Sequence, residues 1–399
     1  MDCIPNVNGD LLWVGANDRR LNLFENAFPI ARGISYNAYL LLDEKTVLLD
    51  TVDKAVGGQL LENMEAGLHG RRLDYIVIHH MEPDHCATLA DVLCRYPEAT
   101  LVMNPKTAAM VEQFFGPDES RHVQIVKEGD KLQTGRHCLT FLMAPMVHWP
   151  EVMVSYDETD QVLFSADAFG SFGAISGFLF ADEVDFDRDW LDEARRYYAN
   201  IVGKYGAPVQ ALLKKLAPFT IATLCPLHGP IWRKDINWFL DKYTHWCTYT
   251  PEHEGVLVAY ASIYGHTQNA AEVLAMELRA ADVRHISVMD LSVTHVSYAM
   301  SEAFRLSRMA LCAPTYNGGL FPAMEQFLLD IKAHNLQNRS VALVENGSWA
   351  PAAGKLMRGM LEGMKNVTVF DETLSIRSAL KPMQREELRT LARRLASGI

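Results

Sequence analysis

Residues 75–85 read YIVIHHMEPDH, and this stretch decides how the first half of the chain is interpreted. A run of apolar residues typical of a strand leads directly into His80, Glu82, Asp84 and His85. Where the chain leaves a sheet, side chains no longer alternate between two faces and can converge on one point. Imidazole and carboxylate groups together suit iron, manganese or zinc. The stretch therefore predicts a metal site at the end of a strand.

Three further potential ligands follow apolar segments in the same way. His148 lies in APMVHWP, Asp167 follows VLFSA, and His228 lies in LCPLHGP. A carboxylate such as that of Asp167 can bridge two metal ions, in which case the other ligands divide into two groups. Any one of these residues alone could be a solvated or helix-capping residue, but their combination favours a metal site. The neighbouring His79 would face away from His80, and we expect it to be structural.

The first 250 residues mix short strands and surface helices without regular alternation. Strands are expected at 11–14, 36–42, 46–50, 75–79 and 100–103, with a hairpin formed by 152–156 and 161–166. Helices are expected at 86–95, 107–115, 190–202 and 209–216. This pattern indicates an α+β domain.

The pattern changes after the polar segment TPEHEG, which spans residues 250–255. Strands are expected at 256–261, 285–290, 309–313, 341–345 and 367–370, and helices at 267–280, 323–334, 352–364 and 384–396. Strands joined by helical crossovers predict a parallel, doubly wound α/β sheet. We therefore expect two domains, residues 1–250 and residues 251–399.

Three loops of the second domain are expected to share the carboxyl edge of this sheet, where doubly wound folds bind ligands. The first precedes a helix, and its backbone N–H groups with the Ser262 and Thr267 hydroxyls can hold a phosphate. It lacks Gly-x-Gly-x-x-Gly, which favours a mononucleotide over a dinucleotide. Tyr316 and Trp349 could pack against a planar ring or be ordinary core residues. The predicted cofactor-binding residues are Ser262, Ile263, Tyr264, Gly265, His266, Thr267, Pro314, Thr315, Tyr316, Asn317, Gly318, Asn346, Gly347, Ser348 and Trp349.

The ligand pattern His-x-Glu-x-Asp-His, followed by His, Asp and His, resembles the binuclear site of the metallo-β-lactamase fold. Most hydrolases of that fold carry His-x-His-x-Asp-His, whereas this chain has Glu82. The added carboxylate favours an iron pair over a zinc pair. The variant resembles the flavodiiron proteins, also called A-type flavoproteins, and the second half resembles flavodoxin, which binds FMN.

The resemblance implies a metallo-β-lactamase-like αββα domain followed by a flavodoxin-like domain. It also implies reduction of dioxygen to water, of nitric oxide to nitrous oxide, or of both. The implied ligands of one iron are His80, Glu82, His148 and Asp167, and those of the other are Asp84, His85, Asp167 and His228, with a solvent-derived oxygen bridge. Electrons would pass through FMN from rubredoxin or a similar small carrier. The family further implies a head-to-tail homodimer, or a homotetramer. The sequence stops after the last expected helix, which leads us to expect the minimal two-domain type.

Charge, hydropathy and cysteine spacing argue against several other classes of protein. A net charge of −12 over 399 residues argues against nucleic-acid or membrane-surface binding. No apolar run approaches the roughly 20 residues of a membrane span, and no secretory signal is visible, so we expect a cytoplasmic protein. The seven cysteines are irregularly spaced and form no Cys-x-x-Cys pair. We expect free, buried thiols and no rubredoxin-type iron site within the chain.

Two rival functions remain open at this stage. A binuclear zinc hydrolase with an appended flavodoxin-like domain is disfavoured by Glu82, and a non-catalytic electron carrier is disfavoured by the full ligand set. Near the metal site, Tyr197 or Tyr198 could present a hydroxyl to the substrate, and Trp149 could wall the pocket. Packing within the fold is the alternative for all three aromatic residues.

Overall fold

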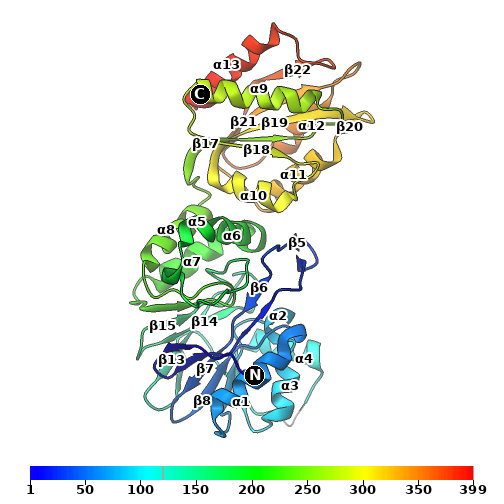
Figure 1. The fold of residues 1–399 in the computed structure, drawn as a ribbon. Coiled ribbons are helices and arrows are strands. Elements are labelled where there is room, and N and C mark those ends of the chain that lie inside the picture. The colour runs from blue at the N-terminus through cyan, green and yellow to red at the C-terminus, as the bar shows by residue number, and fades with distance from the viewer. Residues whose placement is uncertain (119–120, 399) are drawn as a thin grey trace. The chain divides into compact units, whose positions relative to one another are not determined.

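The computed structural model describes residues 1–118 and 121–398. They form two compact units (Figure 1). Unit 1 comprises Met1–Tyr198 and Ala207–Asp241, and unit 2 comprises Ala199–Gly206 and the chain from Lys242 onward. Among the described residues, the search for a helix long and apolar enough to cross a membrane finds none.

The first sheet of unit 1 carries the predicted metal-binding stretch. Its strand order is β1-β2-β7-β8-β9-β10-β11, and β8 to β11 run parallel. The strands are β1 (Asn6–Asn8), β2 (Leu11–Trp13), β7 (Tyr39–Leu42), β8 (Thr46–Leu49), β9 (Tyr75–Val77), β10 (Thr100–Met103) and β11 (Val123–Ile125). The crossovers contain α1 (Gly57–Leu68), α2 (Pro83–Cys86), α3 (Leu89–Arg95) and α4 (Pro105–Phe115).

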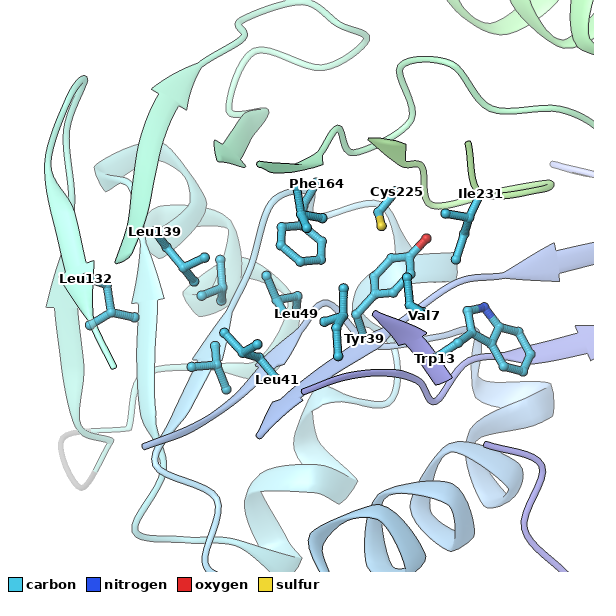
Figure 2. Packing of buried hydrophobic residues seen from close by; sticks show 14 of the residues in the cluster. Val7, Trp13, Tyr39, Leu41, Leu49, Leu132, Leu139, Phe164, Cys225 and Ile231 are labelled. Carbon is cyan, nitrogen blue, oxygen red and sulfur yellow. The ribbon is translucent and has the colours of Figure 1, made fainter. Parts of the chain in front are cut away.

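The second sheet of unit 1 has the order β12-β13-β14-β15-β16. Its strands are β12 (Lys131–Gln133), β13 (Cys138–Met143), β14 (Met153–Asp157), β15 (Val162–Phe164) and β16 (Thr223–Cys225). Strands β14 and β15 pair antiparallel, which confirms the predicted hairpin. Leu41 and Leu49 of the first sheet share a buried cluster with Leu139 and Phe164 of the second (Figure 2). The two sheets therefore pack face to face, as expected for an αββα sandwich.

The remaining elements up to Cys247 are two small strand pairs and several helices, of which α7 and α8 are the longest. Strand β3 (Ala16–Asp18) pairs with β6 (Ile34–Tyr36), and β4 (Leu23–Phe24) with β5 (Phe28–Pro29). The other helices are η1 (Lys54–Val56), η2 (Ala181–Glu183), α5 (Phe186–Asp189), α6 (Leu191–Tyr197), the π-helix η3 (Tyr198–Val202), η4 (Gly203–Tyr205), α7 (Gly206–Leu216) and α8 (Ile236–Cys247).

Several helix predictions in the first 250 residues need correction. The predicted helix 86–95 is two helices, and the first, α2, begins earlier, with Pro83 in its first turn. The predicted helix 190–202 changes into the π-helix η3 after Tyr197. Helices α1 and α8 were not predicted. Helix α1 contains glycines that lower helix propensity, but a Cβ at Gly57 would lie 2.8 Å from Thr88, so close packing explains that glycine.

Unit 2 is built around one sheet with the order β18-β17-β19-β21-β22, in which all neighbours are parallel. Its strands are β17 (His253–Tyr260), β18 (His285–Asp290), β19 (Leu306–Tyr316), β20 (Gly319–Leu320, paired with β19), β21 (Arg339–Asn346) and β22 (Val367–Ile376). Its helices are α9 (His266–Ala280), α10 (Val296–Arg305), α11 (Pro322–Ala333), α12 (Ala353–Leu361) and α13 (Gln384–Ser397). Numbered within the unit, the parallel strands follow the order 2-1-3-4-5, which is that of flavodoxin-like folds. The doubly wound sheet is thus confirmed, and α10 is an addition to the prediction.

All seven cysteines are free. The buried thiols are those of Cys86, Cys225, Cys247 and Cys312. Burial raises the pKa of the Cys312 thiol to about 12. The expectation that every thiol is buried is wrong for Cys3 and Cys94, which are exposed, and for Cys138, which is half-buried. Cys3 precedes the first strand, and Cys94 lies on the solvent side of α3.

Candidate functional site

The predicted metal-binding stretch turns sharply after β9. Strand β9 ends at Val77, and the four-residue helix α2 begins at Pro83. His80 and Glu82 lie in the intervening loop, and Asp84 and His85 lie within α2. Side chains alternate between the two faces of a sheet along a strand, but this alternation ends where the chain turns into the helix. The four side chains can therefore point toward the same region.

A first group brings together His80, Glu82, His148 and Asp167, whose ligand atoms lie within 4.8 Å of one another. Oε2 of Glu82 is 3.2 Å from Nε2 of His80 and 3.1 Å from Nε2 of His148. Oδ2 of Asp167 is 3.2 Å from both of these nitrogens. Two imidazoles and two carboxylates thus point at one small volume.

A second group consists of Asp84, His85 and His228. Oδ2 of Asp84 lies 3.3 Å from Nε2 of His85 and 3.2 Å from Nε2 of His228. The other oxygen of Asp167, Oδ1, lies 3.1 Å from Nε2 of His85 and 3.6 Å from Nε2 of His228. Asp167 therefore turns one oxygen to each group, which is the geometry of a carboxylate that bridges two ions.

The residues fit a pair of cations. Both carboxylate oxygens of Asp84 and of Asp167 are buried without a hydrogen bond, and so is Nε2 of His148. Nε2 of His85 and Nε2 of His228 face each other over 3.1 Å. Buried polar atoms in this state are costly unless a ligand takes them up. The four imidazoles and three carboxylates are the donor types that iron, manganese or zinc accept.

Burial and charge act in opposite directions on the titration of these groups. Burial opposes protonation of His148, but Asp167 and Glu82 outweigh it and raise the pKa of His148 to about 9. Burial likewise opposes protonation of His85, but Asp84 and Asp167 raise its pKa to about 9. Burial disfavours the Asp167 carboxylate, yet His85 and the other imidazoles hold the pKa of Asp167 well below its usual range. The carboxylates thus stabilise positive charge on the imidazoles, and bound metal ions would replace the protons.

One residue of the site was not predicted. Oε1 of Glu151 lies 2.7 Å from Nδ1 of His80 and accepts a hydrogen bond from the backbone N–H of Met81. Glu151 is buried, three residues after His148, and its place in the segment HWPE was the available signal. The adjacent His79 bonds to Asp50 over 2.5 Å, which supports the structural role expected for it.

Aromatic side chains enclose the site. The Trp149 ring lies 5.2 Å from the His80 ring, which is compatible with both roles considered for it, a pocket wall and simple packing. The rings of Phe24 and Tyr197 lie 5.3 Å and 5.5 Å from the His228 ring. Tyr198 is also fully buried. Both tyrosines are therefore buried in the fold, and a role for either hydroxyl toward substrate stays a prediction.

A third cluster of possible ligands in unit 1, His137, Asp157 and Asp160, is explained without a metal. Arg136 donates to both oxygens of Asp160, and its guanidinium lies 2.9 Å from Nε2 of His137. Nδ1 of His137 bonds to Asp157 over 2.8 Å. Because the guanidinium already supplies the positive charge, this cluster is a structural network.

The three predicted loops of unit 2 surround a cavity of about 580 Å³ at the carboxyl edge of the sheet. All predicted residues line it except Gly265, and Ala350 and Ser378 are additions that the sequence did not indicate. Its full lining is Ser262, Ile263, Tyr264, His266, Thr267, Pro314, Thr315, Tyr316, Asn317, Gly318, Asn346, Gly347, Ser348, Trp349, Ala350 and Ser378.

The cavity is built from backbone, small polar groups and exposed rings. Gly265 precedes α9 with φ +87°, in the left-handed region, and its N–H donates to Oγ of Ser262 over 3.0 Å. The lining contains no Lys or Arg, so α9 and the loop amides would hold a phosphate. Tyr264 and Trp349 are 90% and 89% exposed, which excludes ordinary core packing for Trp349. Flat, exposed rings beside a loop whose amides could hold a phosphate fit an aromatic mononucleotide such as FMN.

The two units together define a two-domain class of protein. A metallo-β-lactamase-like sandwich with two convergent ligand groups is followed by a flavodoxin-like sheet with a nucleotide-sized cavity. The family model described as "ODP family beta lactamase" matches residues 34–229. That range includes every residue of both ligand groups.

Whole-chain comparisons are more specific. The structure of rubredoxin oxygen:oxidoreductase from Desulfovibrio gigas superposes with a TM-score of 0.93 at 28% identity, covering 99% of this chain and 98% of that one. Nitric oxide reductase from Moorella thermoacetica is 28% identical over 98% of each chain. Anaerobic nitric oxide reductase flavorubredoxin from Aeromonas hydrophila is 28% identical over 94% of this chain and 75% of its own.

The chain is homologous to the flavodiiron proteins over nearly its whole length. The same homology identifies it as an oxidoreductase, and it gives no support to the binuclear zinc hydrolase alternative. The flavodiiron protein of Giardia intestinalis, at 22% identity and a TM-score of 0.90, supports the fold alone.

Proposed function

We propose that this chain reduces a small diatomic gas, dioxygen to water or nitric oxide to nitrous oxide or both, at a pair of iron ions. The observation that carries the proposal is Asp167, whose two oxygens face two separate ligand groups. The proposed ligands are those predicted from the sequence: His80, Glu82, His148 and Asp167 for one ion, and Asp84, His85, Asp167 and His228 for the other. The names of the homologous reductases support the reaction and its substrates.

The protein side chains would fix and shield the reacting centre. When bound, the iron pair would supply electrons to the gas and positions to which it can bind. Asp167 would hold the two ions at a fixed separation, and Glu82 would add the negative charge that favours iron over zinc. Trp149, Tyr197 and Phe24 would keep bulk water from the site. Tyr197 or Tyr198 would orient the substrate or its protons through a phenolic hydroxyl.

Electrons would enter through FMN bound in the unit 2 cavity. Thr267, Ser262 and the first loop would hold the phosphate, and Tyr316 and Trp349 would flank the ring. We propose rubredoxin or a similar small carrier as the electron donor, which the name of the Desulfovibrio relative supports. We also propose residues 1–250 and 251–399 as the two functional domains, and a head-to-tail homodimer or a homotetramer, on the resemblance to the family alone.

The test begins with iron and flavin quantification on the purified protein, with two irons and one FMN expected per chain. The reduced protein is then mixed anaerobically with dioxygen or nitric oxide in a stopped-flow instrument. Fast reoxidation of flavin and iron by either gas is expected, and the relative rates define the preferred substrate. Reoxidation no faster than that of free reduced FMN would contradict the proposal. Light scattering of the same sample tests the dimer.

A further inference from the structure

The two ligand groups differ in what lies behind their imidazoles. Nδ1 of His80, in the first group, donates to the carboxylate of Glu151 over 2.7 Å. Nδ1 of His228, in the second group, donates to the backbone carbonyl of Ser35 over 2.8 Å. Nδ1 of His85 is buried and has no hydrogen-bond partner among the described residues. Only one of these three imidazoles is therefore backed by a charged group.

Glu151 is held in place independently of His80. Its Oε1 also accepts from the backbone N–H of Met81 over 3.0 Å. Its backbone carbonyl accepts from Nδ2 of Asn104 over 2.5 Å, and Oδ1 of Asn104 caps helix α4. The Glu151 side chain is fully buried. Because these contacts fix both the backbone and the carboxylate, Glu151 cannot turn away from His80 without breaking the cap contact or its own hydrogen bonds.

The chemical effect of such a partner is known in general terms. A carboxylate that accepts from the outer nitrogen of a metal-binding imidazole fixes its tautomer, orients the ring and makes the inner nitrogen a stronger donor. A backbone carbonyl, as at His228, fixes the tautomer but brings no charge. Glu151 thus adds a buried negative charge to the first group. In the part of the chain that the structure describes, no carboxylate bonds to Nδ1 of His85 or of His228 in the second group.

We infer that Glu151 is a positioning residue that acts through His80 and makes the two metal positions unequal. The ion held by His80, Glu82 and His148 is bound more tightly than the ion held by Asp84, His85 and His228. When the ions are iron, the first position also keeps the ferric state more strongly. The part that concerns iron rests on the proposed function.

The first test needs no variant. The reduced holoprotein, shown to hold two irons per chain, is challenged anaerobically with a chromogenic ferrous chelator. Release is expected in two phases of one iron each, with clearly different rates. Release of both irons in one phase would overturn the inference. A protein that lacks two irons at the outset contradicts the proposed function instead, so the two failures are distinguishable.

The second test is Glu151→Gln, which keeps the size and an acceptor oxygen but removes the charge. The slow phase of iron release is expected to accelerate about 10–100-fold while the fast phase stays unchanged. A reductive titration followed by electron paramagnetic resonance measures the range of potential in which one iron of the pair is ferrous and the other is still ferric. This range should become narrower in Glu151→Gln, because the iron at the first position becomes easier to reduce and its potential approaches that of the other iron.

Asp50→Asn is the matched control. Asp50 bonds to Nδ1 of His79, just as Glu151 bonds to His80, but His79 belongs to neither ligand group. This variant removes a buried carboxylate that bonds to the neighbour of His80, and it should leave both release phases and the titration unchanged. If Glu151→Gln accelerates both phases equally, or if Asp50→Asn has the same effect as Glu151→Gln, general loosening of the fold explains the data and the inference is wrong.

Discussion

The candidate metal site of unit 1 is assembled from charged side chains that are almost completely buried, whereas the cavity of unit 2 is lined by uncharged loops that remain open to solvent. In the candidate metal site, carboxylate and imidazole atoms lie close together, and several of them have no hydrogen-bond partner. In the cavity, the hydrogen-bond donors are backbone N–H groups of helix α9 and of the loops, which do not depend on which side chains are present. The first arrangement depends on individual residues and the second on the fold, so substitutions should affect them very differently.

The largest effect is expected for Asp167→Ala. Because its two oxygens face both ligand groups, loss of the carboxylate should remove both irons, which elemental analysis per chain would show. Asp160→Ala removes a carboxylate that pairs with Arg136 and should keep the full iron content. Retention of one iron by Asp167→Ala would mean that the carboxylate does not bridge.

Glu82→His should change the identity of the metal more than its amount. It restores the His-x-His-x-Asp-His pattern and removes a negative charge, so the ratio of bound zinc to bound iron should rise about tenfold or more. The measurement is anaerobic reconstitution with equal concentrations of ferrous and zinc ions, followed by elemental analysis. Glu82→Asp keeps the charge and should keep the preference for iron. An unchanged ratio in Glu82→His would show that Glu82 does not select the metal.

Gly265→Val should weaken FMN binding and leave the iron content unchanged. Space is not the obstacle, since a Cβ at Gly265 would meet nothing within 4 Å. The φ of +87° is the obstacle, because it costs about 1–2 kcal/mol for a residue with a side chain, or roughly a 5–30-fold loss of affinity. Fluorescence titration of the flavin-free protein measures this. Gly359→Ala, at an exposed helical position, is the control. Loss of iron together with FMN would contradict independent sites.

The smallest effect concerns Asp43, a carboxylate of unit 1 that is satisfied by the chain itself. Burial works against its charge, but the N–H groups of His137, Arg136 and Glu44 and the Thr134 hydroxyl lower the pKa of Asp43 to about 2. Because the pKa of Asp43 is lower in the folded chain than in the unfolded chain, where it is about 3.9, the ionised carboxylate stabilises the fold at pH values above about 3.9. This stabilisation is lost as the pH falls through about 2.

Asp43→Asn should therefore reduce the free energy of unfolding at pH 7 by about 1 kcal/mol, after allowance for solvent screening. Urea unfolding followed by circular dichroism at pH 7 and at pH 2.5 measures this difference. The difference in the free energy of unfolding between the variant and the natural chain should be smaller at pH 2.5 than at pH 7. A gap that is the same at both pH values would show that the carboxylate charge contributes nothing.

The sequence predicted which residues come together in both candidate sites because they lie at strand ends, and strand ends are visible as transitions from apolar runs to polar groups. The hairpin of β14 and β15 and the parallel strands of unit 2 followed from the same periodicity. Glu151 was missed because its relevance depends on a contact with His80, 71 residues away. Helix α1 was missed because packing around Gly57 outweighs the low helix propensity of glycine. Both features depend on contacts between segments far apart in the sequence, which a local sequence pattern does not reveal.

The burial of the thiols has a consequence for durability. Dioxygen and nitric oxide, the proposed substrates, give rise to species that oxidise or nitrosate thiolates, and the thiolate is the reactive form of cysteine. Burial raises the pKa of Cys86, Cys247 and Cys312 to about 12, so these thiols stay protonated as well as shielded. Damage from the protein's own turnover would then concentrate on the exposed Cys3 and Cys94, neither of which lies in a strand.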